Sequence, residues 1–141
     1  EAGAEKRSVD FDFRKSVAYD PDRKEQFLRI ARWQLRLLAK ALGLTADQYD
    51  LRSNRAGIAV SGEVTLHADH LYVQASQPFG RFDSGVLFRT CKGRKDYVGG
   101  PNNFASLDLL HRPDDLVRRI VIEPAERLIR EEIEKIKANP E

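Results

Sequence analysis

One amphipathic helix dominates the sequence, and its caps and spacing limit the folds that the chain can adopt. The stretch DPDRKEQFLRIARWQLRLLAKALG offers an N-cap oxygen at Asp20, a proline at the first helical turn (Pro21) and a C-cap glycine (Gly43). These signals predict a helix over residues 21–42. Its large apolar side chains share one broad arc, so another layer of the fold must cover that arc.

After Tyr49 the apolar spacing changes from helical to alternating, which is typical of β-strands. The alternating pairs and the turns between them predict a β-meander over about residues 48–91. We therefore predict an α+β fold of two layers, with the long N-terminal helix and C-terminal helices packed on a three- or four-stranded antiparallel β-meander. The alternating pairs are Ile58 and Val60, Val64 and Leu66, and Leu71 and Val73.

The chain of 141 residues has the size of one domain. We expect a single α+β domain over residues 21–141, preceded by residues 1–20 as an N-terminal arm or a short edge strand. In the strand alternative, VDFDF places Val9, Phe11 and Phe13 on one face; in the arm alternative, Phe11 and Phe13 anchor the arm on the core.

Beyond the meander, the sequence predicts a basic, glycine-rich loop over residues 92–103 and C-terminal helices over residues 105–138. Pro124 is expected to start or kink the final helix, because proline disrupts a helix interior. Residues 118–122 are apolar enough to form an edge strand instead. Apolar residues after Val117 recur at helical spacing as far as Ile136, which predicts a helix with one apolar face.

Composition indicates the class and the cellular location of the protein more clearly than its activity. Hydrophobic residues make up 41% of the chain and charged residues 33%, which fits a globular protein. A single cysteine cannot close an intramolecular disulfide and favours a reducing, cytoplasmic location. No apolar run approaches the roughly 18 residues of a membrane span, so no membrane partner is expected. The formal net charge of +2 does not by itself favour nucleic acid.

The stretch RTCKGRKDYVGGPNN is the first candidate binding site. Lys92, Arg94 and Lys95, with Arg89 before them, could present cations and free backbone amides to phosphates, and Tyr97 could stack on a base. Its spacing matches no phosphate-binding fingerprint. The alternative is a solvated loop whose charges serve only solubility.

The second candidate is a stripe of cations along the first helix: Arg29, Arg32, Arg36 and Lys40. No acid lies between Glu25 and Asp47, although acids usually alternate with bases on exposed helices. The stripe could follow a nucleic-acid backbone, or it could pair with the acidic C-terminal helix of the same chain or of a neighbouring one.

Histidine and cysteine offer weaker signals. His67, Asp69 and His70 flank an expected hairpin tip, but their spacing is no metal signature, so neither a metal nor another cofactor is expected. His67 or His70 could act as a general acid or base beside Arg89 or Lys92. Cys91 is interpreted as a small buried strand residue rather than a nucleophile.

Three functions follow from these patterns. The first is a small, non-catalytic module that binds nucleic acid or another polyanion, which requires the two basic clusters to form one surface. The second is a protein-interaction or homodimeric accessory protein that uses the cationic helix and the C-terminal helix. The third is a small metal-independent hydrolase or ribonuclease that uses His67 or His70. We assign no catalytic residue, because no pair of titratable groups has a recognisable spacing.

Overall fold

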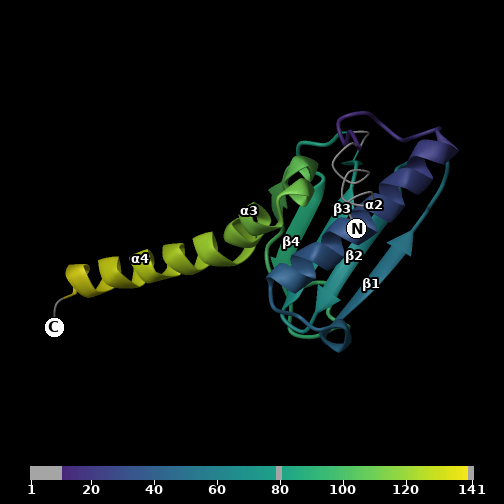
Figure 1. Ribbon diagram of the computed structural model, residues 1–141. Helices are drawn as coiled ribbons and strands as arrows, with labels where there is room; N and C mark the ends of the chain where they lie inside the picture. The colour runs from purple at the N-terminus through teal and green to yellow at the C-terminus, as the bar shows by residue number, and fades with distance from the viewer. Residues whose placement is uncertain (1–10, 79–80, 140–141) are drawn as a thin grey trace.

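The computed structural model describes residues 11–78 and 81–139. Helix α2 (Pro21–Ala41) lies across one face of a five-stranded antiparallel sheet, and a second helical segment covers the same face near the other edge (Figure 1). The predicted α+β class is confirmed, with five strands in the meander. No helix in these residues is long and apolar enough to cross a membrane.

Each strand of the sheet pairs with the next one along the chain, so the order is β1-β2-β3-β4-β5. The prediction that Ile58 and Val60 form part of a strand is wrong, because both lie exposed in the loop between β1 and β2. The sheet has one strand more than the three or four predicted, because the last residue of the predicted basic loop and the two residues after it form β5. The strands are β1 (Tyr49–Asn54), β2 (Glu63–Ala68), β3 (Leu71–Ser76), β4 (Val86–Thr90) and β5 (Asn103–Ala105).

Helix α2 begins at the predicted residue and ends one residue before the predicted end, with Leu42 rather than Gly43 as its C-cap. The Asp20 carboxylate accepts a hydrogen bond from the Arg23 backbone N–H at 3.1 Å, and Gly43 takes the left-handed conformation with φ of 78° after the helix. The inner side of α2 packs on one face of the sheet, which we call the inner face. The core between them includes Phe27, Ala31, Leu35, Leu38, Val64, Leu66 and Val73.

Residues 11–20 form turns rather than a strand, so the edge-strand alternative is wrong for them; Val9 lies outside the described residues. The anchoring role of the two phenylalanines is confirmed, since Phe11 and Phe13 are both buried in the core. The buried Gln77 side chain holds this segment against the core through hydrogen bonds. Its side chain accepts a hydrogen bond from the Val17 N–H at 2.9 Å and donates to the carbonyl oxygens of Phe13 and Lys15.

The C-terminal segment covers the sheet only with its first part, the short helices η3 (Leu107–His111) and α3 (Pro113–Val117). Leu107, Leu110 and Leu116 are fully buried there. After a wide helical turn, η4 (Arg118–Ile122), helix α4 (Glu123–Ala138) has no buried residue and extends away from the domain (Figure 1).

The wide turn η4 ends two residues before Pro124, as expected when a proline disturbs the helix on its N-terminal side. A proline cannot donate the backbone hydrogen bond to the carbonyl four residues earlier, and its ring crowds that carbonyl. The chain widens locally instead, and the Glu123 N–H bonds to the carbonyl oxygen of Arg118. Residues 118–122 are therefore helical, and the edge-strand alternative for them is wrong.

Candidate functional site

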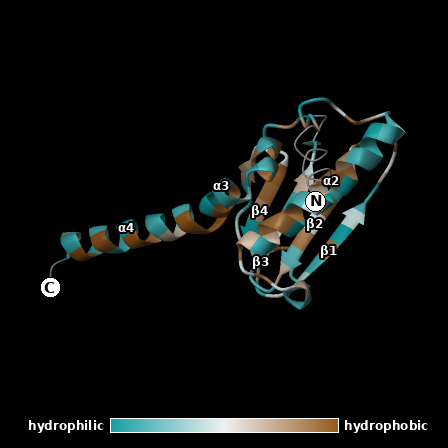
Figure 2. Cartoon of the chain, in the orientation of Figure 1, coloured by the Kyte–Doolittle hydropathy of each residue, from teal (hydrophilic) through white to brown (hydrophobic). Residues whose placement is uncertain are grey.

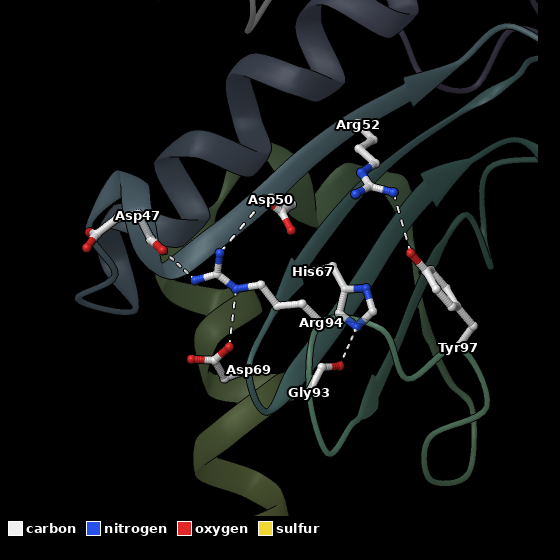
Figure 3. A network of polar contacts seen from close by, with 8 residues as sticks. All are labelled: Asp47, Asp50, Arg52, His67, Asp69, Gly93, Arg94 and Tyr97. Atoms are coloured by element: carbon white, nitrogen blue, oxygen red, sulfur yellow. Dashed lines mark hydrogen bonds and ion pairs between the residues drawn. The ribbon is translucent and has the colours of Figure 1, made fainter.

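The basic loop folds back over the outer face of the sheet, opposite α2. His67 points to this face, and its Nε2 lies 3.0 Å from the carbonyl oxygen of Gly93 (Figure 3). The His67 ring packs edge-on against the rings of Tyr72 and Tyr97, with centroids 5.1 and 5.3 Å away. The side chain is buried. His67 therefore fastens the loop to the sheet.

Three backbone N–H groups of the loop donate hydrogen bonds to a carboxylate of the loop itself. The Asp96 side chain accepts hydrogen bonds from the N–H groups of Gly99 and Lys92 at 2.9 Å and from that of Val98 at 3.1 Å. These bonds hold the pKa of the Asp96 carboxyl below its ordinary value. The three amides are thus already paired with an anion from the loop itself, so a phosphate would have to displace Asp96.

Two of the four candidate cations around the loop also serve the fold. Arg94 turns back towards Asp69, whose carboxylate lies 3.2 Å from its Nε; it also reaches Asp50 and donates to the carbonyl oxygen of Asp47 (Figure 3). Arg89 is buried, with its guanidinium 4.1 Å from the centroid of the Tyr72 ring.

Three members of the predicted polyanion site remain exposed on the loop. Lys92 and Lys95 point to solvent, and Tyr97 is 58% exposed. The Tyr97 carbonyl oxygen accepts a hydrogen bond from Arg89, and its hydroxyl lies within reach of Arg52. The exposed positive charge of the loop is therefore limited to two lysines.

The cationic stripe of α2 lies on the other side of the sheet from the loop. Arg29, Arg36 and Lys40 are exposed, whereas Arg32 donates a hydrogen bond to the Ser53 hydroxyl at 3.1 Å. Because the pleat of β2 directs Leu66 towards α2 and His67 towards the loop, the sheet separates the two basic clusters. They do not form the single surface that the polyanion hypothesis required.

Of the residues considered for catalysis, His67 and Arg89 lie on the same outer face and both contact the Tyr72 ring, whose centroid lies 5.1 Å from that of His67 and 4.1 Å from the Arg89 guanidinium. Both side chains are buried, His67 against Gly93, whereas His70 is exposed at the tip of the β2–β3 hairpin. Cys91 is buried, its thiol donates to the carbonyl oxygen of Ala68 at 3.3 Å, and burial raises its pKa. Among the described residues no cluster of His, Cys, Asp and Glu side chains could hold a metal ion.

The most unusual surface of the protein lies on α4 and the turn before it. Figure 2 shows apolar residues recurring along the exposed helix. At about 100° per residue these side chains fall on one side of the helix, and we call this the α4 apolar face. Its exposed fractions run from 39% at Ile122 to 65% at Leu128. The face comprises Val121, Ile122, Leu128, Ile129, Ile133 and Ile136.

A groove opens where α4 leaves the domain. One wall is formed by the start of the C-terminal helical segment, from Ile120 to Leu128, and the other by the chain after α2 and the tip of the β2–β3 hairpin. The cavity holds about 540 Å³. We call it the basal groove; its principal apolar residues are Leu42, Leu44, Leu71, Ile120, Val121 and Leu128.

The sequence had predicted a helix with an apolar face here, but its spacing did not reveal that the face is exposed. Only the small size of the sheet hints at this exposure. α2 and the segment around Leu107 already cover its inner face, so little of that face remains for another apolar helix. No known protein family, curated protein or solved structure matches this chain. The geometry alone must therefore suggest a function.

Proposed function

We propose that this chain is a homodimeric protein-interaction module that associates through the α4 apolar face. One observation carries the proposal: six large apolar side chains, each at least 39% exposed, line one side of a helix that leaves the domain. Contiguous apolar patches of this kind are rare on monomeric proteins and mark interaction surfaces.

The stability of α4 supports the same conclusion. The 16 residues of α4 gain no packing from their own domain, although most helix stability in proteins comes from packing of an apolar face. The ion pairs along α4 are exposed, and pairs of that kind contribute little. A second surface that covers Ile129, Ile133 and Ile136 would supply the missing packing.

Sedimentation equilibrium over a range of protein concentrations tests the proposal. We expect a dimer with a dissociation constant in the micromolar range or below for the natural sequence. The double variant Ile129→Ala, Ile136→Ala should be monomeric, because it removes apolar surface and retains strong helix formers. Ile58→Ala is a matched control, since Ile58 is equally exposed, at 61%, in a loop between β1 and β2. A monomer at every concentration for the natural sequence would refute the proposal.

A second candidate function is polyanion binding by α2 alone. Arg29, Arg36 and Lys40 are exposed on one helix, and among the described residues no carboxylate pairs with them. Fluorescence anisotropy of labelled DNA and RNA, with salt varied, tests it. Binding that weakens steeply with salt and is lost in Arg29→Ala, Arg36→Ala, Lys40→Ala would support it, whereas Lys92→Ala, Lys95→Ala separates any contribution of the loop.

A further inference from the structure

The proposed dimer does not by itself say what covers the outer half of α4, residues 131–138. We infer that it rests in the basal groove of a second copy of this chain, so that the two α4 helices run antiparallel and each inserts its outer half beside the other's base. The inference rests on the proposed self-association and names the surface that accepts the helix.

The first argument is continuity of apolar surface. Val121 and Leu128 belong both to the α4 apolar face and to the wall of the basal groove, so the groove opens directly onto that face. A helix laid antiparallel along the base of α4 contacts this wall and, on its other side, Leu44 and Leu71 of the domain. The groove would thus pack two sides of the incoming helix.

The second argument concerns which helix can enter. The chain's own outer half cannot reach the groove, because residues 113–138 are helical throughout and α4 itself forms one wall. A second copy carries the same unpartnered isoleucines, Ile129, Ile133 and Ile136, at the same distance from its own groove. A twofold axis therefore fills both grooves at once, as an isologous interface requires.

The third argument is area. At 1.5 Å per residue, α4 is about 24 Å long, and a packed helix covers a strip about 10 Å wide. Two α4 helices packed along their length bury one such strip each. The outer half of each helix also buries a half-length strip against the domain wall of the partner's groove and covers an equal area there, which gives roughly 1,000 Å² in total. This is the lower bound for a specific interface. A contact between the outer halves of α4 alone would bury about a quarter as much.

Charge on the two surfaces is close to balanced. Lys40 is exposed two residues before Leu42 and Asp69 lines the groove, while the outer half of α4 carries Lys135 and Lys137 beside Glu131, Glu132 and Glu134. Dimerisation should accordingly change little as salt is raised, and the apolar contacts carry it.

A groove variant and a crosslink test the inference together. Leu44→Glu places a charge in the groove without touching α4, and we expect it to raise the dimer dissociation constant at least a hundredfold. Val60→Glu is the matched control, because Val60 is exposed in the loop between β1 and β2, at the opposite end of β2 from the β2–β3 hairpin that lines the groove. In a Cys91→Ala background, mixing Leu44→Cys chains with Ile133→Cys chains should give a disulfide between the two under mild oxidation.

The outcomes separate the inference from the proposed function. If Leu44→Glu dimerises like the natural sequence and the mixed disulfide does not form, the groove is not the seat of α4, although the dimer itself stands. If the natural sequence is monomeric, both fail. Circular dichroism and Trp33 fluorescence check that Leu44→Glu folds; if it does not, the mixed disulfide alone decides, its formation supporting the inference and its absence overturning it.

Discussion

Replacing Gln77 with alanine should strongly destabilise the fold, because one side chain fastens the N-terminal segment. Gln77 is 3% exposed and makes three side-chain hydrogen bonds, to the Val17 N–H and to the carbonyl oxygens of Phe13 and Lys15. Lys15 is exposed, so water can replace the bond to its carbonyl. The groups of Val17 and Phe13 lie in the core and would be left without partners.

A buried polar group that loses its partner costs about 1–3 kcal/mol, so the two groups together predict a loss of about 2–6 kcal/mol. That is a large share of the roughly 5–15 kcal/mol that stabilises a typical domain. Urea denaturation followed by the fluorescence of Trp33, the single tryptophan, measures the change.

The matched control is Gln74→Ala, on the outer face of β3. Gln74 accepts a hydrogen bond from the Tyr72 hydroxyl at 3.0 Å in a partly exposed setting, so we expect a loss below about 1 kcal/mol. If Gln77→Ala costs no more than the control, residues 11–19 are not held by this side chain, and the reasoning is refuted.

Three further predictions concern the loop. Gly99→Ala should cost about 1–3 kcal/mol in thermal or urea unfolding, because φ is +59° and a Cβ would lie 2.5 Å from the Thr90 carbonyl oxygen, whereas Gly93→Ala meets no atom within 4 Å and should be nearly neutral. The fold lowers the pKa of Asp96, so its ionised carboxylate stabilises the folded state. This stabilisation is complete above the unfolded pKa of about 3.9 and is lost as pH falls through the lower pKa of the folded state. The Gly99 amide resonance should titrate in that acidic range, and a midpoint above it would contradict the assignment. Cys91 should react slowly with a thiol reagent at neutral pH until the protein unfolds, because burial raises its pKa, and rapid native labelling would contradict this.

The helix α2 could be predicted nearly to the residue because its signals are local. Asp20, Pro21 and Gly43 act within one turn of the helix ends, and the apolar arc repeats over five turns. The hairpin from β2 to β3 was equally readable, since the turn at Ala68 and Asp69 interrupts two alternating runs.

The strands at the edges of the sheet could not be predicted from the sequence in the same way. β5 has three residues, too few for an alternating pattern, and pairs only with β4. Ile58 and Val60 show the opposite error: two apolar residues spaced by two imitate a strand, although no partner strand reaches them.

The loop illustrates why charge in a sequence does not define a binding surface. Composition showed the cations but not their direction, which depends on partners far away in the chain. Arg94 bonds to Asp69 and to the Asp47 carbonyl across 25 and 47 positions of sequence. Likewise, the helical spacing of Ile129, Ile133 and Ile136 is the same whether a helix packs on its own core or on another chain.

Hydrogen exchange of α4 at increasing protein concentration tests most directly whether this helix is covered by a second copy. We predict that the amides of residues 123–138 exchange fast in dilute protein and become protected as concentration rises, and that Ile129→Ala, Ile136→Ala abolishes this concentration dependence. Fast exchange of α4 at every concentration, with the amides of α2 and the sheet protected throughout, would contradict the proposed homodimer.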